Sequence, residues 1–225
     1  MARKLGTLTI GQAPRADITP ILDAVLPDDV PRHHAGVLDG LTQAEIARDF
    51  APRPEGALLT TRLLDGSAVI TDRDKTEAAA ASKLAMLEAE GCSTILMLCT
   101  GHFGTLACKQ ARLVEPDRIL PPAVAAMVGE EQIGIVVPLA EQIDSEAAKW
   151  RPLARPPIYA AASPYVETEP GLAEAAAELA QRGATILLLD CMGFVERHRT
   201  EAARGSGLPV ILSNSMIAKL VSEIL

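Results

Sequence analysis

Two stretches of the sequence share one pattern: GCSTILMLCTGHF at residues 91–103 and GATILLLDCMGF at residues 183–194. In each stretch a glycine is followed by a mostly apolar run and, eight positions after the glycine, by a cysteine. Each stretch also follows a segment of helical period, so the repeated unit is predicted to be a helix, a terminating glycine, a buried strand and a cysteine. Cys99 and Cys191 are therefore expected at the carboxyl ends of two strands.

The rest of the chain alternates short aliphatic runs with Ala-, Leu- and Glu-rich segments, which is typical of parallel βα units. Strands are predicted at residues 4–10, 94–98, 132–137, 156–162 and 185–190, and helices at residues 15–26, 72–91, 140–150 and 169–183. Residues 208–225 are expected to form a strand and then a helix with Ser213 or Asn214 as its N-cap.

Two local signals add detail to this outline. Within residues 56–71, Asp65-Gly66 stands between two apolar runs, a pair that predicts an antiparallel hairpin. Thr42 followed by Glu45 predicts a capping box at the start of a helix.

Together these elements predict an α/β fold with two pseudo-symmetric, doubly wound parallel-sheet lobes and a β-hairpin excursion in the first lobe. The first lobe is expected to contain residues 1–120 and 208–225, and the second lobe residues 121–207. Such sheets bind ligands beyond the carboxyl ends of their strands. If the lobes face each other, Cys99 and Cys191 would approach one ligand from opposite sides.

Composition narrows the functional classes. The 225-residue chain is 48% hydrophobic and 3% aromatic, as expected for a globular protein with an aliphatic core. Its formal net charge of −8 disfavours binding to nucleic acid or to an anionic membrane.

No apolar run reaches the ~20 residues of a membrane span, and the sequence starts without a signal-peptide core, so a cytoplasmic protein is predicted. TIGQAPRAD, residues 9–17, lacks the glycine motifs of nucleotide sites, and no cofactor is expected.

Two opposed cysteines suit the inversion of a carbon acid's stereocentre, because one removes a proton from one face while the other returns a proton to the opposite face. The pKa of a thiol is ordinarily about 8.5, and a following helix or a nest of backbone N–H groups lowers it. Gly101 and Gly193, each two residues after its cysteine, would let the backbone approach a ligand closely.

Two other interpretations stay open. Both cysteines could be packing residues at strand ends, since free cysteine is often buried. Alternatively, Cys99 and His102 have a C-x-x-H spacing, and Cys191 with His198 could complete a zinc site. The matched positions of the cysteines favour catalysis over packing. The lack of a second close Cys/His pair disfavours zinc, so no metal is expected.

Further substrate-binding residues are predicted in loops that follow strands. Gly11, Gln12 and Arg15 lie in the first such loop, where the two-pronged guanidinium of arginine fits a carboxylate. The alternative is that Gln12 and Arg15 are solvated turn residues. Ser163 and Tyr165 are predicted to cover the ligand from the second lobe. FVERHR, residues 194–199, is predicted to be the solvated start of a helix rather than a functional cluster.

Several longer motifs resemble the AroM family, small bacterial proteins encoded beside shikimate-pathway genes in some genomes. The motifs are LTIGQAPRAD, GVLDGLT, TRLLDGSAV, LMLCTGHF, LVEPDRILPP, LDCMGFVERHR and PVILSNSMIAKLVSE, and the resemblance covers essentially the whole chain. The family's name reports a gene neighbourhood and does not specify a reaction.

The two cysteine-ended strands more distantly resemble the aspartate/glutamate racemase superfamily, which includes hydantoin racemases, maleate isomerases and arylmalonate decarboxylases. That resemblance implies cofactor-independent enzymes, often homodimers, with two α/β lobes and one catalytic cysteine in each. It implies Cys99 and Cys191 as the catalytic residues and a substrate carboxylate held by backbone N–H groups. These N–H groups would belong to Thr100, Gly101, Met192 and Gly193.

The chain also departs from the amino-acid racemases that it resembles. Those enzymes usually follow the first cysteine with a polar pair and the second with threonine and an assisting His or Glu, whereas here the pairs are Thr100-Gly101 and Met192-Gly193. Asp190, directly before Cys191, would disfavour the thiolate.

The sequence thus predicts a racemase or isomerase of a small carboxylate or amide-like carbon acid. The alternatives are a non-catalytic small-molecule binding or regulatory protein, and a one-cysteine decarboxylase.

Overall fold

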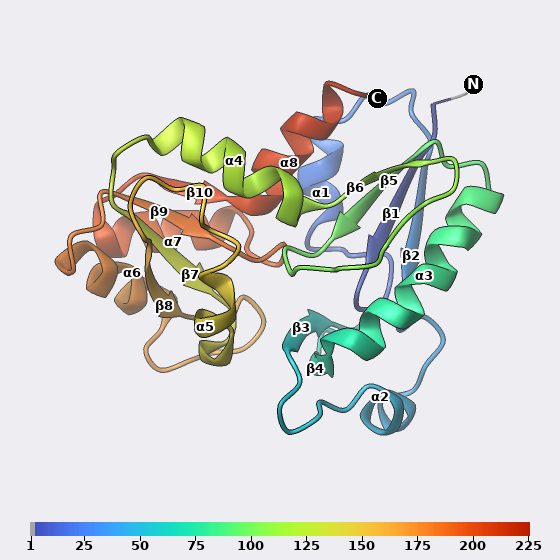
Figure 1. Cartoon of the computed structure of the whole chain (residues 1–225), viewed down its shortest axis with the longest axis horizontal. Helices are drawn as coiled ribbons and strands as arrows, with labels where there is room; N and C mark the ends of the chain where they lie inside the picture. Colours follow the sequence, from blue (N-terminus) through green and yellow to red (C-terminus); the bar gives the residue numbers. More distant parts are fainter. Residues whose placement is uncertain (1–2) are drawn as a thin grey trace. The chain divides into compact units, whose positions relative to one another are not determined.

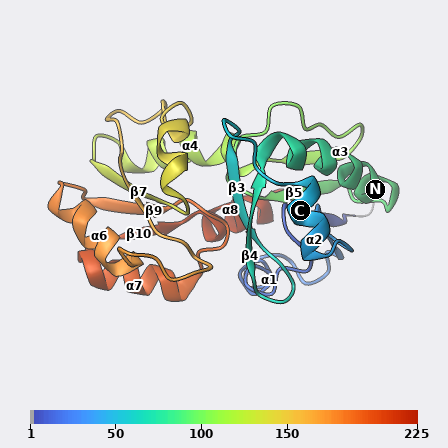
Figure 2. The ribbon, with the colours of Figure 1, turned by 90° about the horizontal axis from the view of Figure 1, so that it is seen from below.

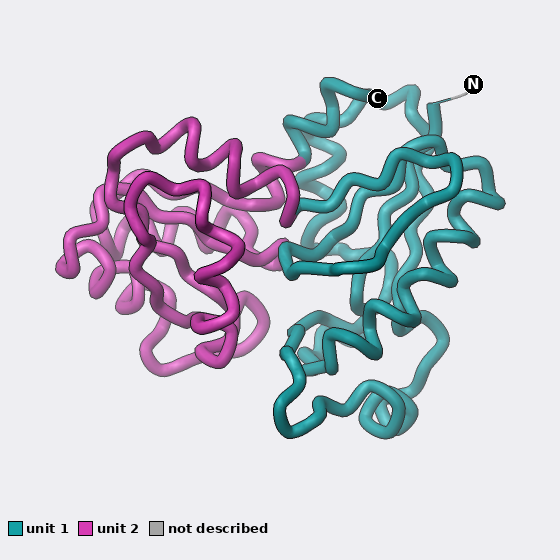
Figure 3. Tube along the Cα trace, viewed as in Figure 1, with its two compact units in different colours: residues 1–116, 218–225 teal, residues 117–217 magenta. Residues whose placement is uncertain are grey.

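The computed structural model describes residues 3–225 and divides into two compact units (Figures 1 and 3). Of the described residues, unit 1 contains 3–116 and 218–225, and unit 2 contains 117–217. The structure has the mixed α/β class that the sequence predicts, with one parallel sheet in each unit.

The sheet of unit 1 has the order β2-β1-β5-β6. Its strands are β1 (Leu5–Thr9), β2 (Arg32–Gly36), β5 (Thr94–Leu98) and β6 (Arg112–Val114). Every residue of β1 and β5 is buried, because α1 (Thr19–Asp23) and α3 (Arg73–Ala89) lie on opposite faces of the sheet (Figure 2).

A separate two-stranded sheet lies beyond the carboxyl ends of β1 and β5, as Figure 1 shows. It is the antiparallel hairpin of β3 (Leu58–Arg62) and β4 (Ala68–Asp72), and it follows α2 (Gln43–Asp49). The predicted Asp65-Gly66 turn is confirmed, with Gly66 at φ +88°, a conformation that favours glycine. The capping box of Thr42 and Glu45 at the start of α2 is also confirmed.

The sheet of unit 2 has the order β10-β9-β7-β8. Its strands are β7 (Ile133–Val137), β8 (Ile158–Ala161), β9 (Ile186–Leu189) and β10 (Val210–Leu212). The helices are α4 (Pro116–Val128), α5 (Ile143–Glu146), α6 (Leu172–Gln181), α7 (Glu196–Ser206) and the first part of α8 (Ser213–Ser222), which continues into unit 1 at residue 218. Helices α6 and α7 cover one face of the sheet and α4 covers the other (Figure 2).

The two sheets have the same topology. If the hairpin is set aside and the strands of each unit are numbered along the chain, both sheets have the order 2-1-3-4. The pseudo-symmetry predicted from the sequence is therefore present in the strand order. In such a sheet the strand order reverses between the first and third strands, which is where open α/β sheets bind ligands.

Two predicted helices are shorter than expected. Residues 15–26 form a turn at Arg15 and then only α1, which starts next to Pro20 because proline is favoured in a first turn. Residues 140–150 form a 3₁₀ turn at Ala140–Gln142, then α5 and a further turn to the buried Trp150. Residues 208–225 are predicted to join the first lobe; residues 218–225 do belong to unit 1, whereas strand β10 pairs with β9 in unit 2.

Candidate active site

Cys99 follows the third strand of the unit 1 sheet directly. Strand β5 ends at Leu98, which pairs with Thr9 at the end of β1, so the Cys99 thiol lies at the switch point of this sheet. Cys99 is buried, and its Sγ accepts a hydrogen bond from the N–H of Gly101 at 3.4 Å. A hydrogen bond to sulfur from a backbone N–H favours the thiolate.

Cys191 holds the corresponding position in unit 2. It follows β9, the third strand of that sheet, and is also buried. The N–H of Gly193 donates to Cys191 Sγ at 3.5 Å, and the Tyr165 hydroxyl lies 3.7 Å from the same sulfur. The two units thus repeat a cysteine, a glycine two residues later and a backbone N–H directed at the sulfur.

The two glycine N–H groups, which the resemblance implies as ligands of a substrate carboxylate, donate to the cysteine sulfurs in this structure. The glycines also make room for protein atoms. A Cβ on Gly101 would lie 2.9 Å from Leu59 Cδ2, and one on Gly193 would lie 2.3 Å from the Tyr165 hydroxyl oxygen. A following helix and backbone N–H groups are the two features expected from the sequence to lower a thiol's pKa. No helix starts directly after Cys99, because residues 99–111 form a loop, so only a backbone N–H is present there.

The loop after Cys191 is held by the start of α8. Asn214 Nδ2 donates to the carbonyl oxygens of Met192 at 2.8 Å and Phe194 at 2.6 Å. Ser213 Oγ donates to the carbonyl oxygen of Leu189 at 2.8 Å. The sequence predicts Ser213 or Asn214 as the N-cap of this helix; in the structure both side chains donate to carbonyl oxygens of the segment that carries Cys191.

The predicted substrate loop of unit 1 is mostly engaged in internal contacts. Gln12 Nε2 donates to the carbonyl oxygens of Leu38 and Leu41 at 3.2 and 3.1 Å, and Gln12 Oε1 accepts from the Leu64 N–H at 2.9 Å. Gly11 passes so close to the hairpin that a Cβ on it would lie 2.3 Å from the Arg62 carbonyl oxygen. Gln12 therefore joins the loop to the hairpin, a structural role that the sequence analysis did not predict.

Arg15 is buried and forms a two-pronged ion pair with its neighbour Asp17. Its Nε and Nη2 donate to the two carboxylate oxygens at 2.9 and 2.7 Å, and its Nη1 donates to Thr9 Oγ1 at 3.3 Å. The geometry is the carboxylate fork that the sequence predicted, but the carboxylate belongs to the protein.

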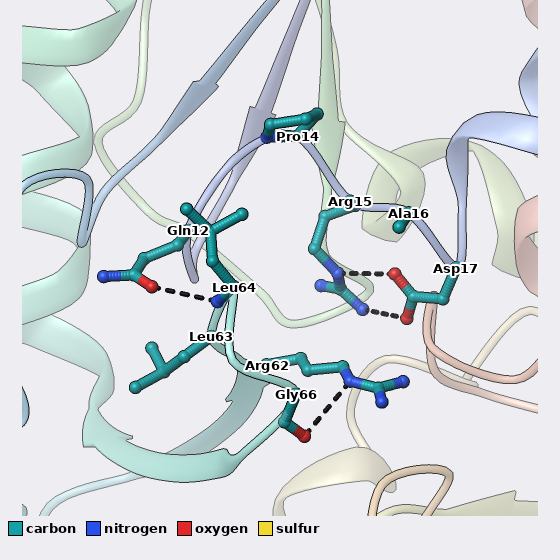
Figure 4. Close-up of a pocket in the computed structure, with 9 residues that line it drawn as sticks. All are labelled: Gln12, Pro14, Arg15, Ala16, Asp17, Arg62, Leu63, Leu64 and Gly66. Carbon is teal, nitrogen blue, oxygen red and sulfur yellow. Dashed lines mark hydrogen bonds and ion pairs between the residues drawn. The ribbon is translucent and has the colours of Figure 1, made fainter.

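Arg62, which the sequence analysis did not single out, faces the same region. A pocket of about 300 Å³ lies between the first loop and the hairpin (Figure 4). It is lined by Gln12, Pro14, Arg15, Ala16, Asp17, Arg62, Leu63, Leu64 and Gly66. The available signal was the position of Arg62, at the last residue of a strand just before the turn of the hairpin.

In unit 2, Ser163 and Tyr165 do lie in one loop beside Cys191. Ser163 Oγ accepts the N–H groups of Tyr165 and Val166 at 3.1 and 3.4 Å, so it shapes the loop. Both residues line a cavity of about 640 Å³ that also includes His198. His198 is buried against Phe194 and its Nδ1 accepts the Val195 N–H at 2.8 Å, so the predicted solvated helix start is buried at this residue.

A buried ion cluster lies beside Cys191. Lys149 Nζ contacts Asp190 Oδ2 and lies 3.2 Å from Glu146 Oε2, and the Lys149 and Asp190 side chains are 5% and 1% exposed. Burial would lower the pKa of Lys149, but the charges of Asp190 and Glu146 raise it. Burial raises the pKa of Glu146 to about 7, although Lys149 opposes this. The charge of Asp190, which the sequence analysis expected to disfavour the Cys191 thiolate, is thus countered by an ammonium.

Within residues 3–225, no group of three or more His, Cys, Asp or Glu side chains is placed to hold a metal ion. In the same part of the chain, no helix is long and apolar enough to span a bilayer.

Comparison with known families assigns the chain. The model of the family described as "AroM protein" matches residues 5–225. The chain belongs to the AroM family. A comparison with curated proteins finds no match for this AroM-family sequence.

Solved structures similar to this AroM-family protein share its fold at low sequence identity. The glutamate racemase isoform RacE1 from Bacillus anthracis has a TM-score of 0.65 and 15% identity, over 99% of this chain and 81% of that one. The maleate isomerase Iso from Pseudomonas putida S16 has a TM-score of 0.61 and 11% identity, over 99% and 93%. The allantoin racemase from Klebsiella pneumoniae has a TM-score of 0.59 and 14% identity, over 99% and 87%. The racemase-like fold predicted for the AroM-family chain is confirmed.

Proposed function

We propose that this AroM-family protein is a cofactor-independent racemase or isomerase of a small carboxylate or amide-like carbon acid. Cys99 and Cys191 would act as an acid/base pair on opposite faces of the substrate. The observation that carries the proposal is the repeated half-site: in each sheet of order 2-1-3-4, a cysteine follows the third strand and accepts a backbone N–H from the glycine two residues later.

The reaction requires only proton transfer. The thiolate of one cysteine takes the proton from the carbon beside the carboxylate or amide, and the electron pair of that C–H bond passes into an enolate-type anion. The thiol of the other cysteine then gives its proton to the opposite face and becomes the thiolate. The product is the inverted isomer, no redox partner is needed, and the two cysteines have exchanged protonation states.

The glycine N–H groups support this chemistry by stabilising whichever sulfur is ionised. A thiolate has to form near neutral pH, and a hydrogen bond to the charged form lowers a thiol's pKa. The shared fold with racemases and a maleate isomerase agrees with the proposal. The substrates in the names of those proteins belong to those proteins.

One observation favours a second candidate, a one-cysteine decarboxylase. Tyr165 contacts the sulfur of Cys191, and Leu59 packs against Gly101 beside Cys99, so the surroundings of the two half-sites differ. With a single working thiol, loss of CO₂ would leave a carbanion that this thiol protonates on one face. An arylmalonate decarboxylase has the same fold, with a TM-score of 0.56 at 12% identity over 99% of this chain and 91% of that one.

The test is hydrogen–deuterium exchange followed by NMR in D₂O, with a panel of small chiral acids, amino acids and hydantoins. Wild type is compared with Cys99→Ser and Cys191→Ser, and Cys108→Ser serves as a matched control because Cys108 lies outside both half-sites. We expect exchange at a stereocentre with loss of optical rotation, abolished in the two half-site variants and retained in the control.

Other outcomes would separate the alternatives. Exchange with retained configuration that survives one of the two substitutions would favour the one-cysteine mechanism. Ligand binding without exchange or turnover, unchanged when both cysteines are serine, would favour a binding or regulatory protein.

A further inference from the structure

The pocket of unit 1 between the first loop and the hairpin contains more positive than negative charge. Its lining has two guanidinium groups, of Arg15 and Arg62, and one carboxylate, of Asp17. Arg15 and Asp17 bind each other through two hydrogen bonds, as Figure 4 shows, so their charges offset. The uncompensated charge of the pocket is that of Arg62.

The Arg62 guanidinium is held in place but uses little of its hydrogen-bonding capacity. Its Nε donates to the Gly66 carbonyl oxygen at 3.2 Å, which fixes the plane of the side chain across the turn (Figure 4). Within residues 3–225, no carboxylate forms an ion pair with Arg62. Gly66 helps to keep the group accessible, because a Cβ there would lie 3.3 Å from Arg62 Nη2.

The pocket belongs to the same edge of the sheet as Cys99. The N–H of Gln12, in the loop after β1, donates to the Arg62 carbonyl oxygen at 3.3 Å. Three residues before Arg62 on the same strand, Leu59 packs so closely on Gly101 that a Cβ there would be 2.9 Å away. One hairpin strand therefore contacts both the loop after the first strand and the loop that carries the cysteine.

We propose that this pocket is an anion subsite in which Arg62 binds a carboxylate of the substrate at a position separate from the reacting carbon. The terminal nitrogens of an anchored guanidinium match the two oxygens of a carboxylate. Pro14, Leu63 and Leu64 give the pocket apolar walls beside this charge. The subsite rests on the proposed function and makes the substrate a small molecule with two acidic groups.

The experiment measures binding rather than turnover. Malonate, succinate and glutarate are each titrated by calorimetry against the full-length protein, alongside their monoamides, which replace one carboxylate with a neutral group of similar size. The variants are Arg62→Gln and Arg62→Lys. The matched control is Arg48→Gln, which removes an exposed positive charge on α2 of the same unit, where Arg48 has a side chain 69% exposed. Circular dichroism checks that each variant is folded.

We expect at least one diacid to bind wild type and Arg48→Gln about 10- to 100-fold more tightly than its monoamide, the range of a charge-assisted contact. Arg62→Gln should remove this preference, and Arg62→Lys, which keeps the charge but loses the fork, should retain only part of it. The subsite is overturned if wild type shows no preference for a diacid, if Arg62→Gln keeps the preference, or if Arg48→Gln loses it equally.

The proposed function can fail separately. The diacid preference should persist when Cys99 and Cys191 are both serine, because neither thiol contributes to it. A preserved preference without any proton exchange would reject the racemase and leave the subsite standing. Exchange of a monoacid that Arg62→Gln does not slow, in a protein with no diacid preference, would reject the subsite and leave the racemase standing.

Discussion

Unit 1 and unit 2 place a cysteine at the same point of the same sheet, but they surround it differently. In unit 1, the hairpin of β3 and β4 covers the strand ends and brings Leu59 against Gly101. In unit 2, Tyr165 contacts the sulfur, and a buried lysine binds the carboxylate directly before the cysteine. The strand order therefore fixes where the sulfur lies, while loops and inserted elements determine the charges and contacts around it.

The difference is clearest in the ion pairs of the two units. Asp72 in unit 1 is buried, but its partner Arg53 is 53% exposed, and the N–H groups of Asp74 and Lys75 also bind the carboxylate. In unit 2, both Lys149 and Asp190 are buried. Removing a cation should therefore have unequal consequences in the two units, because only in unit 2 would a buried carboxylate lose its main source of compensation.

The largest effect is expected from Lys149→Met. It should lower the free energy of unfolding by about 3–5 kcal/mol, the range for breaking a buried ion pair. Arg53→Met should cost about 1 kcal/mol or less, because an exposed guanidinium contributes little. Urea unfolding followed by circular dichroism measures both. Equal losses would show that the buried Lys149–Asp190 pair and the half-exposed Arg53–Asp72 pair contribute equally to stability, which would contradict the expected difference between the units.

The second effect is a pH dependence of opposite sign in the two units. Burial raises the pKa of Glu146 to about 7 from an ordinary value of 4.5, so between these pH values folded unit 2 binds a proton that the unfolded chain has released. The contribution of Glu146 to stability should thus be fully present below pH 4.5 and fall by about 3 kcal/mol as the pH rises to 7. The hydrogen bonds from Arg53 lower the pKa of Asp72, so its contribution is present above the ordinary value and is lost as the pH falls.

The measurement uses Trp150, the single tryptophan, which is buried in unit 2. Urea midpoints from its fluorescence between pH 4.5 and 7 should fall with rising pH in wild type and stay level in Glu146→Gln. Glu174→Gln, on exposed α6 surface, is the control that should keep the wild-type slope. A slope that persists in Glu146→Gln would assign the effect to another group.

The third effect compares the paired glycines directly. A Cβ on Gly193 would overlap the hydroxyl and ring atoms of Tyr165 at 2.3–2.4 Å, whereas on Gly101 it would meet the flexible end of Leu59 at 2.9 Å and Cys99 Sγ at 3.4 Å. Gly193→Ala should destabilise the protein by about 1–3 kcal/mol and Gly101→Ala by less than about 1 kcal/mol, as for overpacked sites of different rigidity. Thermal unfolding measures the difference. Tyr165→Ala in the Gly193→Ala background should recover part of the loss, and no recovery would locate the strain elsewhere.

The strand and cysteine that both units share were predictable from the sequence, whereas the contacts around each cysteine were not. Strand β5 is predicted at residues 94–98 and is found there, because a short apolar run between a helix-terminating glycine and a loop is typical of a buried strand. The position of Cys191 followed from the same pattern. Local period and turn chemistry are sufficient for features of this kind.

The surroundings depend on contacts between distant residues. Gln12 and Leu64 are 52 positions apart, and Lys149 and Asp190 are 41 apart, so no local pattern pairs them. Arg15 was expected to bind a substrate carboxylate because its chemistry suits one, but Asp17 satisfies the same chemistry from two residues away. Arg62 gave only a weak signal, its position at the end of a hairpin strand, because an arginine there is ordinary until the fold shows what it faces.

The smallest expected effect concerns the contact between the Tyr165 hydroxyl and Cys191 in unit 2. In Tyr165→Phe the ring still fills the space over Gly193, and only the hydroxyl at 3.7 Å from Cys191 Sγ is lost. If the hydroxyl donates to the thiolate, its loss should slow iodoacetamide alkylation of Cys191 about fivefold, the equivalent of about 1 kcal/mol. Cys99, quantified in the same sample by peptide mass spectrometry, is the internal control and should keep its rate.

Faster alkylation of Cys191 would instead mean that the hydroxyl accepts the thiol proton, and Cys191 would then rest as the acid of the pair. A similar change at both cysteines would show that Tyr165 does not distinguish the half-sites, which would make the two thiols equivalent and favour two-base racemisation over the one-cysteine alternative.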